Sequence, residues 1–103
     1  MKYFRYTLDD LHKSADKKLF NYITFFAGGG GSSCGYKLAG GEVLFVNEFQ
    51  QVAMDDYLAN FPDTPHHITG DIKDVTGKQI MEMTGLKVGE LDLLDGSPPC
   101  PPF

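Results

Sequence analysis

The chain is 103 residues long, 42% of them hydrophobic, with a formal net charge of −5 at pH 7. This length and composition predict one domain, or part of one, with a modest core, and exclude a disordered or multidomain protein. The acidic balance argues against a nucleic-acid-binding surface in this stretch, and two cysteines without any apolar run near the roughly 20 residues of a membrane span favour a reduced, soluble, cytoplasmic protein.

The first segment, residues 1–20, is predicted to form a short amphipathic helix. Apolar residues recur at helical spacing from Leu8 to Leu19. Thr7 and Asp10 stand at the spacing of a capping box, which would begin the helix.

A buried strand followed by a glycine turn is predicted next. Residues 22–26 are apolar or β-branched, and the run of four glycines over 28–31 comes directly after Ala27. Ser32 and Ser33 are expected to cap a short helix over 34–39.

The remainder of the chain continues to alternate between strands and helices. The pattern predicts strands over 43–48, 66–69 and 91–94, with helices over 51–60 and 75–83. Strands that alternate with helices of this length form a parallel sheet through right-handed crossovers. The fold class is therefore α/β, with a Rossmann-like parallel sheet of about four strands and helices on both faces.

Each predicted strand is followed by residues suited to binding or chemistry. The glycine run follows the first strand, Glu48 ends the second, Asp71 follows the third and Cys100 follows the fourth. Because ligands bind beyond the carboxyl ends of parallel strands, we expect these residues along one rim of the sheet.

The glycine run favours a nucleotide-like ligand. Consecutive glycines allow positive φ and close approach of the main chain, and the following helix offers free N–H groups. Glu48 could accept hydrogen bonds from ribose hydroxyls. The strict dinucleotide pattern G-x-G-x-x-G fails here, although a looser spacing fits Gly29, Gly31 and Gly35, so a nicotinamide cofactor stays an alternative.

Cys100 has the setting of a positioned nucleophile. Pro99 and Pro101 flank it, and proline restricts both its own φ and the residue before it. Cys34, on a short helix, is expected to be a packing residue. His66 and His67 lack a second pair of ligands at metal spacing, so no metal site is expected.

Taken together, these motifs resemble those of the cytosine-5 DNA methyltransferases. The resemblance covers roughly residues 22 to 103 and rests on their order, spacing and strand placement. The motifs are Phe26-Ala27-Gly28-Gly29-Gly30-Gly31 through Gly35, Asn47-Glu48-Phe49, Asn60-Phe61-Pro62, Gly70-Asp71-Ile72 and Asp95-Gly96-Ser97-Pro98-Pro99-Cys100. The sequence departs from the family at Thr24, where an acidic residue is frequent.

The resemblance implies S-adenosylmethionine as the cofactor and assigns it a set of residues. Phe26 would pack on the adenine, with Phe49 and Ile72 flanking the base. Glu48 would hold the ribose, and Asp71 would receive the adenine amino group. The methionine portion would lie along Ala27, Gly28, Gly29, Gly30 and Gly31. Simpler roles stay open, since Phe26 and Phe49 could be core residues and Asp71 could cap the next turn.

The resemblance also implies how Cys100 would react. Its thiolate would add to carbon 6 of a cytosine flipped out of double-stranded DNA, so that carbon 5 can take the methyl group. Pro99 and Ser97 are expected to help position the substrate. The DNA itself would be held by regions outside this chain.

The predicted organisation is a helical segment over 1–20 followed by the N-terminal part of a methyltransferase catalytic domain over 21–103. The target-recognition region and the later motifs of the family have no counterpart here, so the chain alone is expected to be inactive. A bacterial restriction-modification or phage origin is expected. Alternatives are a non-catalytic S-adenosylmethionine-binding fragment or a nicotinamide-binding half-domain. The fourth strand would leave an exposed edge that favours self-association.

Overall fold

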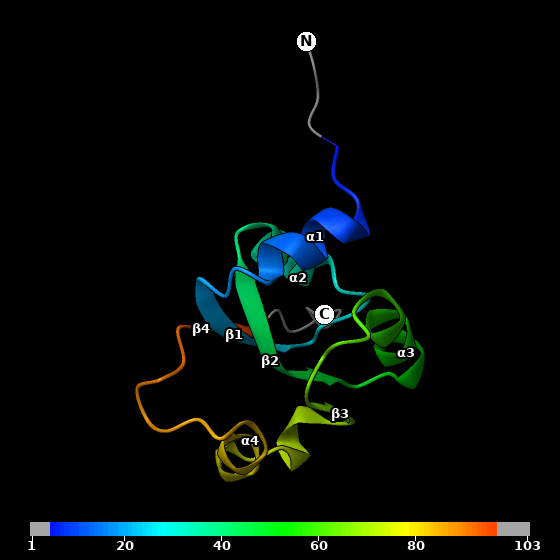
Figure 1. Ribbon diagram of the computed structural model, residues 1–103. Helices are drawn as coiled ribbons and strands as arrows, with labels where there is room; N and C mark the ends of the chain where they lie inside the picture. The colour runs from blue at the N-terminus through cyan, green and yellow to red at the C-terminus, as the bar shows by residue number, and fades with distance from the viewer. Residues whose placement is uncertain (1–4, 97–103) are drawn as a thin grey trace, which may run out of the picture.

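The computed structural model describes residues 5–96 and contains a parallel sheet with helices on both faces (Figure 1). The sheet has four strands in the order β3-β2-β1-β4. Every pair of neighbouring strands is parallel. The strands are β1 (Phe20–Phe25), β2 (Gly41–Glu48), β3 (His67–Thr69) and β4 (Leu93–Gly96). The predicted α/β fold with about four parallel strands is confirmed.

The helices divide between the two faces of the sheet. They are α1 (Leu8–Ala15), α2 (Gly31–Leu38), α3 (Gln51–Asn60), the 3-10 helix η1 (Ile72–Asp74) and α4 (Gly77–Thr84). Side chains of α1, α2 and α3 share one core cluster, whereas Ile80 of α4 belongs to another. Figure 1 shows α4 on the opposite side of the sheet from α1 and α2.

Local sequence signals set several boundaries, although most strands and helices begin or end one to three residues from the predicted positions. The capping box of α1 is present, because the Asp10 N–H donates to Thr7 Oγ1 at 3.2 Å and the Thr7 N–H donates to Asp10 Oδ2 at 2.9 Å. The predicted serine cap of α2 is wrong. Gly30 occupies the N-cap position with a left-handed backbone and no side-chain cap bond, and the helix begins at Gly31. The fourth strand begins at Leu93 rather than at residue 91.

A bulge in β2 allows the central strands to serve both cores. Tyr22 of β1 is paired with Val43 but the next residue, Ile23, is paired with Phe45, so β2 has one extra residue there. An extra residue reverses the alternation of faces from that point onward. As a result Val43 and Val46 both enter the cluster under α1, α2 and α3, while Phe45 enters the cluster under α4.

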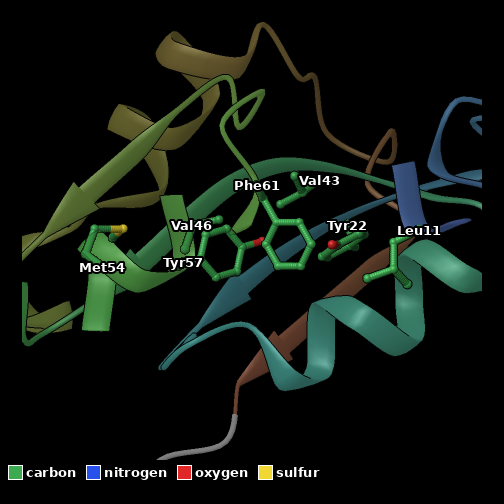
Figure 2. Packing of buried hydrophobic residues seen from close by; sticks show 7 residues of the cluster. All are labelled: Leu11, Tyr22, Val43, Val46, Met54, Tyr57 and Phe61. Atoms are coloured by element: carbon green, nitrogen blue, oxygen red, sulfur yellow. The ribbon is translucent and has the colours of Figure 1, made fainter. Parts of the chain in front are cut away.

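The larger cluster is built around aromatic side chains. Figure 2 shows the rings of Tyr57 and Phe61 side by side within it, and their centroids are 5.0 Å apart. Tyr22, Tyr57 and Phe61 are each at most 1% exposed. Leu11 of α1 belongs to the same cluster, so the N-terminal helix shares the core of the sheet.

The edge strand β4 is attached to β1 by side chains as well as by backbone pairing. The Asn21 N–H donates to Asp92 Oδ2 at 2.9 Å, and the Asp92 N–H donates to Asn21 Oδ1 at 2.7 Å. Thr24, where the family often has an acid, donates through Oγ1 to Asp95 Oδ2 at 3.1 Å. Among residues 5–96, no helix is long and apolar enough to cross a membrane.

Candidate functional site

The carboxyl ends of β1, β2 and β3 surround a cleft of about 520 Å³. It lies at the rim where the sequence predicts a ligand site, and its volume is in the usual range for small-molecule pockets. The structure therefore brings together residues that are far apart in the chain. The predicted site residues that line this cleft are Phe26, Gly28, Glu48, Phe49, Asp71 and Ile72, and Asn47, Gln50, Ala53 and Gly70 complete the lining.

Glu48 is held in a fixed orientation at the centre of this rim. The Gly28 N–H donates to Glu48 Oε1 at 3.0 Å, and the Gln50 N–H donates to Glu48 Oε2 at 2.7 Å. The Glu48 carbonyl accepts a third bond from the Gly70 N–H at 2.9 Å. Each carboxylate oxygen still has acceptor capacity for a ligand hydroxyl, since a carboxylate offers about four lone-pair sites.

Asn47 is a structural residue of the site to which the sequence assigned no role. It is 2% exposed, and its side-chain amide donates to the Ile68 carbonyl at 2.9 Å and to the Gly70 carbonyl at 3.2 Å. Its own carbonyl accepts from the Ala27 N–H at 3.3 Å. Asn47 therefore ties the loop after β1 and the loop after β3 to the end of β2. The available signal was a polar amide at the end of a predicted buried strand, which requires partners.

Asp71 and Ile72 reach the cleft from the turn after β3. Gly70 has a φ of 146°, and Asp71 then caps η1 by accepting the Lys73 N–H at Oδ1 over 2.9 Å. The simpler role considered for Asp71, that of a cap, is thus present. Because the cap uses one carboxylate oxygen and Asp71 also lines the cleft, the cap does not prevent ligand contact.

Two aromatic residues border the cleft in different ways. Phe26 follows β1 directly, is partly buried and has a φ of 57°, a conformation uncommon outside glycine. Such backbone conformations are found most often where a site depends on them. Phe49 is 65% exposed, which excludes the simple core role considered for it.

The remaining residues predicted at the cofactor site lie beside the cleft and form the turn between β1 and α2. Ala27 packs against the larger core cluster, and Gly29 and Gly31 are exposed. Gly30 is buried, and a side chain on it would meet Cε2 of Phe61 at 2.6 Å.

A buried polar group lies behind the glycine turn. The Ser33 and Tyr57 hydroxyl oxygens are 2.7 Å apart in a hydrogen bond, and burial raises the pKa of the Tyr57 phenol. The nearby Tyr22 hydroxyl is buried with no hydrogen-bond partner among residues 5–96, and burial raises its pKa as well. These phenols stay protonated and neutral at physiological pH, so they support the turn without adding charge to the cleft.

Cys100, Pro99 and Ser97 lie outside the described residues. Cys34 is partly buried and packs against the larger core cluster, in agreement with the packing role predicted for it. Within residues 5–96, no group of three or more His, Cys, Asp or Glu side chains is arranged to hold a metal ion.

Comparison with known proteins identifies the family. The family described as C-5 cytosine-specific DNA methylase matches residues 20–103. The chain belongs to this family. The resemblance read from the motifs of the sequence is therefore confirmed.

Several named methyltransferases are similar to this chain over most of its length. Type II methyltransferase M.AquIA of Picosynechococcus is 36% identical over 85% of this chain, which is 34% of the relative. Type II methyltransferase M.SacI of Streptomyces achromogenes is 32% identical over 79% of this chain and 24% of its own length. A DNA-cytosine methyltransferase of Escherichia coli K12 is 33% identical over 82% of this chain and 20% of its own length. The chain thus spans between about a fifth and a third of these relatives.

Proposed function

We propose that the cleft binds S-adenosylmethionine through its adenosine portion. The observation that carries this proposal is the convergence of Phe26, Glu48, Asp71 and Ile72 on one cleft, with Glu48 oriented by two backbone N–H groups. These residues fit an adenosine, because apolar side chains can cover the base while carboxylates accept from its amino group and from the ribose hydroxyls.

Each residue then has a defined role in binding. Phe26 and Ile72 cover the faces of the adenine, and Phe49, which is 65% exposed, closes over it from the cleft mouth. Glu48 accepts from the ribose hydroxyls, and Asp71 accepts from the adenine amino group. The glycine turn, with Ala27, borders the methionine portion, where the absence of side chains lets that portion approach the backbone.

We further propose that the whole protein methylates carbon 5 of cytosine in double-stranded DNA and that this chain by itself is inactive. Bound S-adenosylmethionine would supply the methyl group. The Cys100 thiolate would add to carbon 6 of the flipped base and leave again after carbon 5 has been methylated and has lost its proton. Pro99 and Ser97 would position the base.

The setting of the protein follows from this activity. Several relatives are named type II methyltransferases, a name that fits a restriction-modification system in the bacterial cytoplasm. The DNA contacts would come from regions outside this acidic chain.

The outer edge of β4 is the proposed contact for self-association of the isolated chain. β4 pairs with β1 on one side, and Leu94 is 58% exposed. An exposed edge strand presents backbone groups that can pair with a second strand. Analytical ultracentrifugation should show a mass that rises with protein concentration, and a monomer at the highest concentration would contradict this part of the proposal.

The cofactor proposal can be tested by titration calorimetry with S-adenosylhomocysteine and with NAD. The former should bind more tightly, and Glu48→Gln should weaken it about tenfold or more, because hydrogen bonds to a charged acceptor contribute about 1.5–3 kcal/mol. Glu82→Gln changes an exposed acid of α4 and is the matched control. Tighter binding of NAD, or equal affinity for the parent and Glu48→Gln, would refute the assignment.

The proposed catalytic role of Cys100 needs the whole protein. A duplex that contains 5-fluorocytosine should be trapped covalently, since fluorine replaces the proton that must leave carbon 5. Cys100→Ser should abolish trapping, whereas Cys34→Ser, which changes a core-packing cysteine, should retain it. Trapping by the Cys100→Ser protein would show that another group is the nucleophile.

A further inference from the structure

The glycine turn between β1 and α2 has a backbone that needs external support. Gly28 has a φ of 55° and Gly30 a φ of 103°, and Phe26, two residues before Gly28, has a φ of 57°. Glycine visits such conformations freely but loses more backbone entropy than other residues when it is held in one of them. Within the turn itself, the Gly30 N–H donates to the Ala27 carbonyl at 3.1 Å. One such bond is a weak restraint for a run of four glycines.

The C-terminal end of α3 contacts two residues of this turn and the start of α2. The Asn60 side-chain amide donates to the Gly29 carbonyl at 3.3 Å. The rings of Phe61 and Tyr57 lie against Gly30, since a Cβ there would be 2.6 Å from Phe61 Cε2 and 3.2 Å from Tyr57 Cδ2. The Tyr57 hydroxyl is hydrogen-bonded to Ser33 Oγ at 2.7 Å in the first turn of α2.

These supporting side chains are themselves held firmly. Tyr57 is 0% exposed and Phe61 is 1% exposed. The Lys37 ammonium lies 4.9 Å from the centroid of the Phe61 ring, and the His12 ring meets the same ring edge-on at 6.2 Å between centroids. Burial lowers the pKa of Lys37, and the Asp63 carboxylate partly opposes that shift. A buried ring fixed on several sides cannot move aside for the turn.

The glycine turn in turn orients Glu48, the acid proposed to bind the cofactor ribose. Gly28, next to Gly29, donates its N–H to Glu48 Oε1 at 3.0 Å. A shift of the turn would therefore release one of the bonds that orient the Glu48 carboxylate and would also move Gly28 in the cleft lining.

We propose that Tyr57, Asn60 and Phe61 are positioning residues for cofactor binding, which act through the glycine turn and do not touch the ligand. This inference rests on the proposed S-adenosylmethionine site. The end of α3 determines the conformation of residues 28–31, and through them the orientation of Glu48.

The test compares Asn60→Ala, Asn60→Asp and Tyr57→Phe with Gln51→Ala as the control. Asn60→Asp keeps the size of the side chain but lacks a donor for the Gly29 carbonyl. Gln51 makes an exposed hydrogen bond to Asp55 at 2.8 Å at the other end of the same helix. The Kd of S-adenosylhomocysteine is measured by calorimetry at a temperature where every variant is folded by circular dichroism. Amide hydrogen exchange at Gly30 is measured on the same proteins.

A neutral hydrogen bond contributes about 0.5–1.5 kcal/mol, so each of the three variants should raise the Kd about three- to tenfold. Exchange at the Gly30 N–H should become faster by a similar factor. Gln51→Ala should change neither quantity by more than about twofold. A purely structural role would lower the melting temperature of the variants but leave the Kd of the folded protein unchanged.

The two measurements separate this inference from the proposed cofactor site. If the parent chain binds no S-adenosylhomocysteine, the cofactor proposal fails, and Gly30 exchange still decides whether the end of α3 holds the turn. Unchanged exchange in Asn60→Ala, Asn60→Asp and Tyr57→Phe would overturn the inference. Faster exchange with an unchanged Kd would overturn its link to binding.

Discussion

Replacing Gly30 by alanine should destabilise the protein far more than the same change at its neighbours. Gly30 has a φ of 103°, and an added Cβ would lie 2.6 Å from Cε2 and 3.3 Å from Cδ2 of Phe61. The colliding atoms belong to a ring that is 1% exposed and packed against Tyr57. The variant therefore combines backbone strain with a collision that the core cannot relieve cheaply.

The magnitude follows from two separate costs. A residue other than glycine in a left-handed conformation costs about 1–2 kcal/mol. Overpacking a well-packed core costs about 1–3 kcal/mol. Together they predict a loss of about 2–5 kcal/mol, a large share of the roughly 5–15 kcal/mol that stabilises a typical domain.

Two neighbouring glycines are matched controls because each lacks one or both of these costs. Gly28 has a φ of 55° but open space around its Cβ position, so Gly28→Ala should cost about 1 kcal/mol. Gly29 has open space and no positive φ, so Gly29→Ala should change stability by less than about 0.5 kcal/mol.

Urea unfolding followed by far-ultraviolet circular dichroism measures all three variants under the same conditions. A double-mutant cycle with Phe61→Leu adds a check on the collision. The shorter side chain removes the colliding ring atoms, so Gly30→Ala should cost less by about 1 kcal/mol in that background. Equal losses at the three glycines would show that neither the left-handed backbone nor the Phe61 ring makes Gly30 special, and full additivity with Phe61→Leu would exclude the collision with that ring.

Three further predictions concern other interactions. Asn47→Asp replaces the amide that donates to the Ile68 and Gly70 carbonyls with an acceptor. The free energy of unfolding in urea should therefore fall by about 2–3 kcal/mol at pH 7 and by less at pH 4, where the new carboxyl is protonated. A loss that does not depend on pH would contradict this prediction. Burial raises the pKa of Tyr57, so its contribution to stability is complete below about pH 10 and is lost above that pH, where the unfolded chain ionises, by up to about 1.4 kcal/mol per pH unit. In urea unfolding at alkaline pH, the free energy of unfolding should therefore fall less steeply for Tyr57→Phe than for the parent. Parallel declines would contradict this prediction. In thermal unfolding, Thr7→Ala should lower the stability by about 1 kcal/mol, whereas Thr7→Ser should leave it almost unchanged, because serine can also cap α1. Equal losses in the two variants would argue against the capping box.

Much of the architecture could be predicted because the signals are local. The capping box of α1, the buried run that forms β1 and the alternation of strands and helices depend on residues close together in the chain. Placement of Glu48 and Asp71 at one rim also followed, because parallel strands joined by right-handed crossovers must align their carboxyl ends.

Other features could not be predicted, because they depend on contacts between segments that are distant in the sequence. Ser33 was expected to cap α2, but the Ser33 hydroxyl is buried and hydrogen-bonded to the Tyr57 hydroxyl of α3. Asn47 looked like one member of a motif, and only the pairing of β3 with β2 shows that its amide holds the end of β3 and the turn after it. The bulge at Leu44 depends on pairing with β1 and cannot be read from the hydrophobic pattern of β2 alone.

The glycine run shows where the two kinds of information divide. From the run of four glycines alone it follows that the chain turns sharply between β1 and α2 and can come close to a ligand beyond the sheet, because glycine adopts such a backbone without a steric penalty. The separate roles of these glycines, with Gly28 lining the cleft and donating to Glu48 while Gly30 faces Phe61, arise from long-range packing. Identical residues differ only in what packs against them, and here the packing partners come from β2 and from α3 with the Phe61 that follows it.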